Sequence, residues 1–415
     1  MMATGFILAG VAFGPMGCAG PVETSIRPGA RPAGGPVSIQ PTRNAGFDQW
    51  ISGFTARAQN QGIRGETLSR AFAGVTYDED AIRRDRSQAE FHKAIWEYLD
   101  GAVSTARIAN GRDALARHQG TLSAIEARYG VPAEVVTAVW GMESAYGAMR
   151  GSSDIVSSLS TLAYDGRRGE FFEAQLIAAL KILQSGDVAP RSMTGSWAGA
   201  MGHTQFMPTS YLDYAVDFRG DGRRDIWSDD PTDALASTAN YLAKHGWNRG
   251  QPWAVEVVLP QGFDAALTGK ETKRRPSDWA RLGVRSVAGG TVPDHGQSSI
   301  LIPAGINGPA LMIFDNFRVI ERYNSADAYV IGVGHLSDRI AGAGPIRGAW
   351  PRGERPLAFT ERKELQERLT LAGFSTGGVD GKIGPDTTAA IRQWQRSVGL
   401  APDGFASAAV LAKLR

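Results

Sequence analysis

Apolar residues recur at helical spacing through the first two-thirds of residues 47–340. Leu122, Ile125 and Tyr129 stand at positions i, i+3 and i+7, and Gly130 follows them as a stop signal, so this segment predicts a helix. Comparable patterns predict helices over three further segments: 79–99, 169–183 and 231–247.

The segment 131–144 predicts a buried helix that carries an acid in its last turn. Val135, Val139 and Met142 follow one another at i, i+4 and i+7, as a buried stripe does. Glu143 comes next, in the run "WGMESAYG", among apolar and small residues. Ionised carboxylates are disfavoured in such surroundings, so this group is either paired with an arginine or held protonated for a purpose.

The pattern changes after residue 252. Residues 253–260, 298–304 and 310–324 are rich in β-branched and aromatic residues with turn residues between them, so they predict strands. Residues 326–340 return to a helical pattern. The sequence therefore predicts a mainly α fold with a small β-rich insertion.

Two segments rich in proline and glycine divide the chain. The first contains five prolines between Pro21 and Pro41 and hardly any large apolar residue, which predicts an extended linker. The chain is predicted to consist of a signal or lipoprotein-like segment (1–18), a linker (19–46), a main body (47–340), a second linker (341–356) and a small C-terminal domain (357–415).

The small C-terminal domain is predicted to contain three helices, over residues 360–374, 385–400 and 405–414. The dipeptides Asp380-Gly381 and Asp403-Gly404 precede the last two helices, which indicates an internal half-repeat. Three residues of the middle helix are predicted to face inward: Ile391, Trp394 and Val398.

Composition and charge exclude some functions. The chain has 415 residues, 44 Lys and Arg against 42 Asp and Glu, and a net charge of +2, which gives no reason to expect nucleic acid as a partner. The six histidines are scattered and no HExxH motif is present, so no zinc site is predicted.

The N-terminus predicts export. Residues 6–18 form an apolar run that is too short to span a bilayer and ends in small residues, as a secretory signal does. The chain has one cysteine, Cys18, in "PMGC", which resembles a bacterial lipobox. Acylation of Cys18 would tether the chain to a membrane without spanning it; the alternative is a small residue in an ordinary signal.

The run "DFRGDGRRDIWS" resembles an EF-hand calcium loop in part. Asp217, Asp221 and Asp225 stand at loop positions 1, 5 and 9, where ligands belong. Position 3 is Arg219 and position 12 is Ser228, and neither supplies a carboxylate. Calcium is therefore one reading, and a loop held by Asp–backbone and Asp–Arg contacts is the favoured one.

A segment rich in glycine and alanine, "GSWAGAMGHTQFMPTSY", lets backbone approach a bulky ligand closely. Together with aromatic residues and an acid in apolar surroundings, it is typical of a glycan-binding cleft. Glu143 would then be protonated near neutral pH and would donate its proton to a glycosidic oxygen. Four polar side chains of the segment suit sugar hydroxyls and amides: Ser196, His203, Thr204 and Gln205.

Ordered blocks along the body resemble the lytic murein transglycosylase B family of bacterial cell-wall enzymes (glycoside hydrolase family 103 type). The C-terminal domain, with "LQERL", "GGVDGKIGPDTTAAIRQWQ" and "PDG", resembles the three-helix peptidoglycan-binding domain. The blocks of the body span residues 85–91, 129–147, 159–172, 195–227, 233–247 and 316–329.

The resemblance implies a lysozyme-like core and a lyase-type reaction. The family cuts the β-1,4 bond between N-acetylmuramic acid and N-acetylglucosamine without water, because the muramyl C6 hydroxyl attacks its own C1 and leaves a 1,6-anhydro sugar. By the match of "MESAYG", Glu143 would be the single catalytic acid and then the base. The 2-acetamido group of the substrate can stabilise the cation at C1, so no second carboxylate and no cofactor are implied.

The resemblance also implies substrate-binding residues and a location. Glycan strands of peptidoglycan would be the partner, in the periplasm, with the lipidated Cys18 as a membrane tether. For each tyrosine, a role in the core is the alternative. The residues implied to bind saccharide are Ser196, Gln205, Tyr241, Tyr323, Asn324, Tyr329 and Tyr98.

Three alternatives stay open on the sequence. A hydrolytic lysozyme would use water in place of the C6 hydroxyl, and Asp154 or Asp165 could supply a second carboxylate. A non-catalytic peptidoglycan-binding protein would keep the fold without needing Glu143. A scaffold for other wall enzymes is compatible with catalysis.

Overall fold

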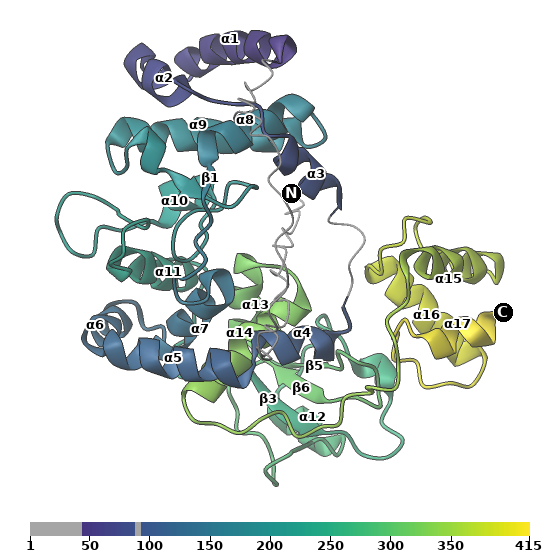
Figure 1. Cartoon of the computed structure of the whole chain (residues 1–415). Helices are drawn as coiled ribbons and strands as arrows, with labels where there is room; N and C mark the ends of the chain where they lie inside the picture. Colours follow the sequence, from purple (N-terminus) through teal and green to yellow (C-terminus); the bar gives the residue numbers. More distant parts are fainter. Residues whose placement is uncertain (1–43, 88–92) are drawn as a thin grey trace, which may run out of the picture.

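The computed structural model describes residues 44–87 and 93–415 (Figure 1). The predicted segment 1–18, including Cys18, and nearly all of the predicted linker 19–46 lie outside the described residues. Within the described part of the chain, no helix is both long and apolar enough to cross a membrane.

Helices make up most of the body. Two very short strands, β1 (Ser153–Asp154) and β2 (Thr194–Gly195), pair antiparallel beside them. The helices before the β-rich insertion are α1 (Ala45–Asn60), α2 (Gly65–Phe72), α3 (Glu79–Ser87), α4 (Ile95–Ala102), α5 (Thr105–Arg117), α6 (Gln119–Tyr129), α7 (Ala133–Ser144), α8 (Ile155–Asp165), α9 (Gly169–Ser185), the 3₁₀ turn Pro190–Ser192, α10 (Pro208–Tyr214) and α11 (Thr232–Lys244).

Helix α7 is the element on which the body is assembled. It packs against α5, α6, α11 and α14 (Asp327–Ile340). Val136 and Trp140 belong to one hydrophobic core, whereas Ala138 and Val139 belong to a second. Because opposite faces of α7 are buried in different cores, the end of this helix is a rigid platform.

The helical ends follow ordinary capping chemistry. Gly130 closes α6 with a φ of 73°, as its place after the apolar stripe predicted. Asp154 caps α8 by accepting a hydrogen bond from the backbone N–H of Ser157 at 2.8 Å.

Residues 79–99, predicted as one helix, contain two, so this prediction is wrong. Ala94 is extended, with a ψ of 149°, and its N–H donates to the carboxylate of Glu97 at 3.1 Å, which starts α4 as a new helix. The two helices also serve different cores, since Ala81 of α3 packs in the first and Leu99 of α4 in the second.

The β-rich insertion forms a four-stranded antiparallel sheet in the order β4-β3-β6-β5. In the register, Ala254 faces Ile313 and Ile300 faces Met312. One face of the sheet buries Trp279 of α12 (Pro276–Arg281). The strands are β3 (Ala254–Val258), β4 (Arg285–Ser286), β5 (Ser299–Leu301) and β6 (Ala310–Ile313), with a 3₁₀ turn at Ala265–Leu267.

The predicted strand 310–324 is correct only in its first part. After β6 the chain turns into α13 (Asp315–Tyr323), which the strand prediction missed. Phe317 and Ile320 are fully buried at i and i+3, and Asp315 lies in the first turn. The strand prediction failed because the helical spacing of apolar residues begins only at residue 315, inside a continuous apolar run.

The C-terminal domain has its own core around α15 (Phe359–Leu371), α16 (Pro385–Ser397) and α17 (Ala408–Leu414). The two halves of the predicted half-repeat make equivalent hydrogen bonds. Gln366 bonds the Asp380 carboxylate at 3.0 Å and the N–H of Gly381 at 2.7 Å. Gln395 repeats both contacts with Asp403 and Gly404 at 2.7 and 2.8 Å.

One inward residue of this domain was predicted wrongly. Ile391 and Trp394 are buried, but Val398 is 50% exposed because α16 ends at Ser397 and the helical face is not continued. The residues 341–356 form no helix or strand, in keeping with the predicted linker.

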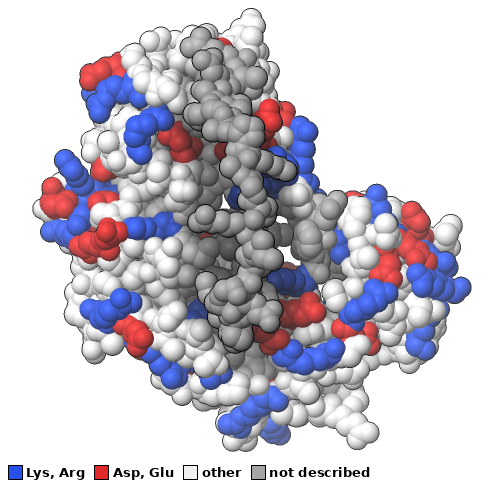
Figure 2. All heavy atoms as spheres, viewed as in Figure 1, with Lys and Arg blue, Asp and Glu red and all other residues white. Residues whose placement is uncertain are grey.

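The linker and the C-terminal domain lie against the body at specific points. Arg352 of the linker pairs with Asp100 of α4 at 2.7 Å. Arg392 donates to the carbonyl of Thr268 at 3.0 Å, and Asp403 accepts from the N–H of Ile306 at 3.0 Å. On the face in Figure 2, basic and acidic side chains alternate in small groups, which gives no continuous basic surface there for nucleic acid.

Candidate active site

Glu143 lies in the last turn of α7, directly before an unusual backbone turn. Ala145, Tyr146 and Gly147 have φ values of 49°, 60° and 87°, so three successive residues are left-handed. Left-handed conformations in residues other than glycine cost about 1–3 kcal/mol each and persist only where surrounding contacts enforce them. The turn therefore needs contacts that hold it.

The side chains of Ser144 and Tyr146 hold this turn by hydrogen bonds within it and to backbone carbonyls of two other segments. Ser144 accepts a hydrogen bond at its Oγ from the N–H of Gly147 at 3.0 Å and donates to the carbonyl of His203 at 2.5 Å. The Tyr146 hydroxyl donates to the carbonyl of Arg107 at 2.7 Å. These contacts join α7 to α5 and to the glycine-rich segment.

His203 is a strut behind the turn rather than an exposed sugar ligand. It is 3% exposed, its Nε2 donates to the carbonyl of Ser228 at 2.7 Å, and its Nδ1 accepts from the indole of Trp140 at 3.2 Å. Burial lowers the pKa of His203, so the ring is neutral, as this bonding pattern requires. A Cβ at Gly147 would lie 2.6 Å from His203 Nδ1, so only glycine fits there.

The Glu143 carboxyl has one direct polar partner in the described structure. The Tyr329 hydroxyl donates to its Oε1 at 2.5 Å. Burial raises the pKa of Glu143 to about 8, although the Tyr329 hydrogen bond lowers it. The side chain retains some solvent exposure, but the protein atoms around it desolvate the charge.

Tyr98 and Tyr323 also lie close enough to Glu143 to sense its charge. Burial raises the pKa of Tyr98 to about 12, and the Glu143 carboxylate adds to this shift. Burial and then Glu143 likewise raise the pKa of Tyr323 well above its ordinary value. Three of the predicted tyrosines are therefore neutral and coupled to this carboxyl group: Tyr329 by a direct hydrogen bond, and Tyr98 and Tyr323 through the effect of its charge on their pKa.

Neither proposed second carboxylate is free. Asp154 pairs with Arg191 at 2.8 Å, and Asp165 pairs with Arg86 at 2.7 Å. Within the described residues, the pKa of Glu143 is set by burial and Tyr329 alone, without a contribution from another carboxylate. The site therefore offers one carboxyl group that is protonated at neutral pH.

An aromatic pocket adjoins these tyrosines. The rings of Tyr241 and Tyr323 are 5.0 Å apart, and Phe206 lies 5.9 and 6.0 Å from them. The hydroxyl of Tyr241 donates to the carbonyl of Arg322, and that of Tyr323 donates to the carbonyl of Thr204, both at 2.6 Å. The pocket is lined by Ala198, Ala200, Gln205, Phe206, Met207, Ser210, Tyr241 and Tyr323.

The polar predicted residues have roles within the protein. Gln205 is left-handed, with a φ of 54°, and donates to the carbonyls of Arg150 and Gly202 at 3.0 and 2.9 Å. The Ser196 Oγ accepts from the N–H of Ala200 at 3.0 Å. Asn324 is 5% exposed and accepts from the N–H of Ala326 at 3.0 Å before α14.

Sequence reasoning missed the residues that support the turn. Arg107 donates to the carbonyl of Gly141, in the last turns of α7, at 2.5 Å, and carries no sequence signal of this role. Arg150 donates to the carbonyls of Trp227 and Ser228 at 2.8 and 2.7 Å. Tyr146 stood inside the quoted motif but could be assigned only once its left-handed backbone was seen.

The three calcium candidates lie in the loop between α10 and α11. Asp217 accepts the N–H groups of Gly220 and Gly222 at 2.6 and 2.8 Å. Asp221 and Asp225 face the guanidinium of Arg219 at 3.2 and 3.8 Å. Among the residues that the structure describes, no three His, Cys, Asp or Glu side chains are arranged to hold a metal ion.

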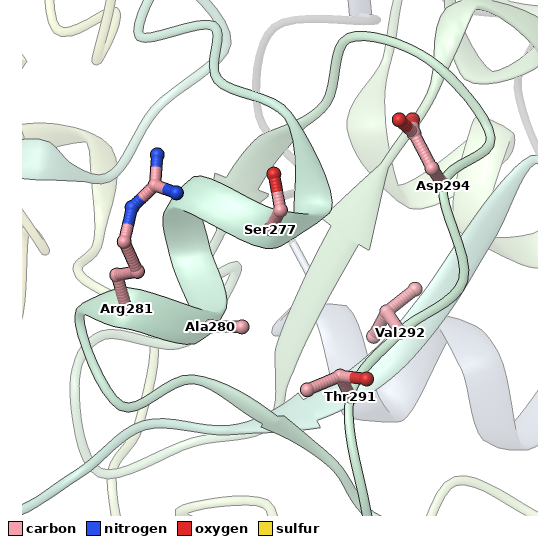
Figure 3. Close-up of a pocket in the computed structure, with 6 residues that line it drawn as sticks. All are labelled: Ser277, Ala280, Arg281, Thr291, Val292 and Asp294. Carbon is pink, nitrogen blue, oxygen red and sulfur yellow. The ribbon is translucent and has the colours of Figure 1, made fainter.

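A second pocket lies in the β-rich insertion, where α12 faces the segment before β5 (Figure 3). It is lined by Ser277, Ala280, Arg281, Thr291, Val292 and Asp294, and none of the predicted site residues is among them. Asp294 pairs with Arg275 at 2.8 Å.

Comparisons with known proteins identify two family matches along this chain. Residues 46–338 match the family of the transglycosylase SLT domain, and residues 360–414 match that of the peptidoglycan binding domain. SltB3 from Pseudomonas aeruginosa, solved in complex with NAG-anhNAM-pentapeptide, is 49% identical with a TM-score of 0.87. The match covers 89% of this chain and 99% of that chain.

Two relatives from Escherichia coli are more distant. The lytic transglycosylase Slt35, solved in complex with calcium, is 30% identical with a TM-score of 0.61, over 72% of this chain and 93% of that one. Membrane-bound lytic murein transglycosylase B of strain K12 is 36% identical over 220 residues, 51% of this chain. The match spans 58% of the length of that curated relative.

A helical, lysozyme-like body with one protonated carboxyl group, followed by a peptidoglycan binding domain, defines the class of this protein. The chain belongs to the transglycosylase SLT domain family of peptidoglycan lytic transglycosylases, and its structural neighbours are of the SltB type. The predicted family and the predicted fold class are confirmed. No cofactor is needed for this enzyme family.

Proposed function

We propose that this protein cleaves the β-1,4 bond between N-acetylmuramic acid and N-acetylglucosamine in peptidoglycan and leaves 1,6-anhydromuramyl ends. One observation carries the proposal: Glu143 is a carboxyl group with a pKa of about 8 and with Tyr329 as its polar partner. A general acid of this kind is protonated at neutral pH and can transfer its proton to a leaving oxygen.

Glu143 acts twice in the proposed reaction. Its carboxyl proton first passes to the glycosidic oxygen while the bond from that oxygen to the muramyl C1 breaks. The 2-acetamido group of the substrate stabilises the positive charge at C1. The muramyl C6 hydroxyl then forms a bond to C1 and returns a proton to the Glu143 carboxylate, which restores the starting state.

The single carboxylate supports this sequence of steps over hydrolysis with two acids. Retaining glycosidases hold two carboxyl groups about 5 Å apart and inverting ones hold them farther apart. Here Asp154 and Asp165 are paired with arginines. The solved relative SltB3 binds NAG-anhNAM-pentapeptide, which is the product type that the proposed chemistry gives.

Saccharide binding is proposed for the predicted cleft residues. Tyr329 bonds Glu143, and the charge of Glu143 affects the pKa of Tyr98 and Tyr323. Gln205 and Tyr241 line the adjoining pocket with Tyr323. Ser196 and Asn324 complete the proposed set on the family motif. Aromatic faces beside a few fixed polar groups are the usual lining of a sugar site.

The proposed setting is the periplasm, with Cys18 as the lipid anchor. The predicted domains, 47–340 for catalysis and 357–415 for binding peptidoglycan, would then act on an insoluble polymer from a tether. Incorporation of labelled palmitate into the wild-type chain and its loss in Cys18→Ser tests the anchor. Equal labelling of the two chains would contradict it.

Mass spectrometry of the sugars released from purified peptidoglycan tests the reaction, with the wild type beside Glu143→Gln. Anhydromuramyl ends from the wild type and none from the variant are the expected result. Reducing ends would identify a hydrolytic lysozyme instead. Bound peptidoglycan without release by the wild type would identify a non-catalytic binding protein.

A further inference from the structure

The loop between α10 and α11 surrounds a cation that belongs to the chain itself. The Arg219 guanidinium lies among four carboxylates, although it stands at loop position 3, where a calcium loop has an oxygen ligand. The nitrogen–oxygen distances are 3.2 Å to Asp221, 3.3 Å to Asp230, 3.6 Å to Asp233 and 3.8 Å to Asp225.

Backbone amides take the other carboxylate oxygens of the loop. One oxygen of Asp225 accepts the N–H groups of Trp227 and Ser228 at 2.9 and 3.0 Å. Both oxygens of Asp217 accept backbone N–H groups, from Gly220 and Gly222 among others. The donor atoms that a metal would need are therefore already directed at amides or at the guanidinium.

Asp233 makes an internal cation necessary. It is fully buried, and burial raises the pKa of its carboxyl although N–H groups of Asp225, Phe218 and Arg219 oppose this shift. Like charges in a confined space repel each other, so this carboxylate and its acidic neighbours need a positive charge between them. Arg219 supplies that charge permanently, since guanidinium does not lose its proton in proteins.

The residues of this loop do not fit a calcium ion. Position 12 is Ser228, which cannot give the bidentate carboxylate of a calcium loop, and position 3 offers no oxygen. An entering ion would have to displace a tethered cation from the same carboxylates. We propose that Arg219 replaces calcium in this loop, so that the loop folds and stays folded without any metal ion.

The loop bears on the catalytic turn, which gives this substitution a functional consequence. The carbonyls of Trp227 and Ser228 accept hydrogen bonds from Arg150 at 2.8 and 2.7 Å. The Ser228 carbonyl also accepts from His203, the strut behind the turn after Glu143. Arg219 is thus a positioning residue that makes the support of the active site independent of ambient calcium.

The first test uses the wild-type full-length chain and measures its thermal unfolding midpoint. The expected Tm is the same in EDTA, in CaCl₂ and in MgCl₂, to within about 1 °C, because ions that do not bind the native state do not stabilise it. A Tm that rises with calcium and falls with EDTA would overturn the proposal.

The second test removes the tethered charge and compares it with a matched change in the same loop. Arg219→Met should lower the Tm by about 5 °C, since unpaired buried carboxylates are costly. Arg223→Met removes the same charge from an exposed side chain that forms no ion pair within the described residues, and should change the Tm by about 1 °C or less. Equal effects of the two variants would contradict the proposal.

The third test rebuilds the ion site. The double variant Arg219→Asn, Ser228→Glu places oxygen ligands at positions 3 and 12, so calcium should raise its Tm by about 5 °C whereas magnesium should not. Titration calorimetry with CaCl₂ should detect calcium binding to this double variant directly. A double variant that ignores calcium would refute the claim that the guanidinium occupies the place of the ion. None of these readouts depends on the proposed reaction.

Discussion

Burial affects two carboxyl groups of this protein, Asp85 and Glu143, whose pKa values are shifted in opposite directions. Asp85 is 2% exposed and is bound by Arg167 and Arg168 at 2.6 and 2.5 Å. Burial alone would raise the pKa of Asp85, but the two arginines outweigh it and the pKa is lowered. Among the described residues, Glu143 has only a tyrosine hydroxyl as its polar partner, and burial raises its pKa to about 8.

The comparison separates a structural acid from a proposed catalytic one. Both acids lie in helices, and desolvation acts to raise the pKa of each, so the direction of this effect does not distinguish them. The difference lies in the partner, since cations hold a carboxylate ionised and a neutral hydroxyl leaves it protonated. Asp85 therefore contributes to stability, whereas Glu143 is free to exchange a proton.

The largest expected effect is on catalysis. Glu143→Gln should lower the rate of glycan cleavage by about 10³-fold, the usual contribution of a general acid. Gln keeps the shape and can still accept the Tyr329 hydrogen bond, so binding to peptidoglycan should survive. The measurement is the initial rate of product release, with sedimentation of bound protein as the control. A variant with wild-type rates would remove Glu143 from the mechanism.

Next in size is the loss of the structural acid. Asp85→Asn should destabilise the fold by about 3 kcal/mol, because it removes the negative charge from the hydrogen bonds that Asp85 accepts from Arg167 and Arg168. The folded fraction should cleave peptidoglycan at the wild-type rate. Denaturant unfolding at pH 7 measures the first quantity and an assay at low temperature the second. Loss of activity without loss of stability would reverse the roles assigned to the two acids.

A smaller effect is expected on stability at the active site. The folded pKa of Glu143, about 8, lies above its ordinary value of 4.5, so the folded state binds an extra proton between these pH values and loses stability as the pH rises through them. Glu143→Gln lacks this penalty and should be more stable than the wild type by about 2 kcal/mol at pH 6, with little difference at pH 4.5 and a larger one at pH 8.

The measurement is the unfolding free energy of both chains from pH 4.5 to pH 8. Asp85 has the opposite linkage, since its lowered pKa gives stability that is present above its ordinary pKa and lost as the pH falls through the folded value. The penalty of Asp85→Asn should accordingly shrink in acid. Parallel curves for the wild type and Glu143→Gln would show that Glu143 is ionised at neutral pH.

The smallest effect concerns the partner of Glu143. The Tyr329 hydrogen bond lowers the pKa of Glu143, so Tyr329→Phe should move the alkaline limb of the pH–rate profile upward by less than about one pH unit. The rate at the optimum should fall about 10-fold, because the carboxyl group loses its orientation. A downward shift of the limb would mean that Tyr329 stabilises the protonated form instead.

Much of the fold was readable from local patterns. The helix 131–144 and its acid were predicted from the apolar spacing and the "SAYG" turn, and α7 ends at Ser144. The errors in the predicted elements arose where one secondary-structure element ends and another begins within one apolar segment. Residues 310–324 contain four residues of strand followed by a helix, and a run of apolar residues does not reveal the junction. Within 79–99, a capping contact of Glu97 started a second helix.

The candidate site was predicted by residue type but not by arrangement. The motif named Glu143 and the tyrosines; in the structure Tyr329 bonds the carboxyl group, and the charge of Glu143 affects the pKa of Tyr98 and Tyr323. The supports could not be found, because they are contacts between distant segments through backbone carbonyls: Arg107 donates to Gly141 of α7, and Arg150, just after the turn, donates to Trp227 and Ser228. His203 looked like a sugar ligand in the sequence, yet burial and three fixed neighbours make it a strut.

The sequence by itself determined the family, the mainly helical fold and the C-terminal unit, and it singled out Glu143 as the candidate acid, because these depend on local spacing and on motifs along the chain. Tertiary structure alone decided the protonation of Glu143 and the role of Arg219. Both depend on which charges come near a buried group, and Glu143 meets a tyrosine whereas Arg219 meets four carboxylates. Electrostatic energies of buried groups depend on the distances between charges and on desolvation, and neither can be read from the order of residues in the chain.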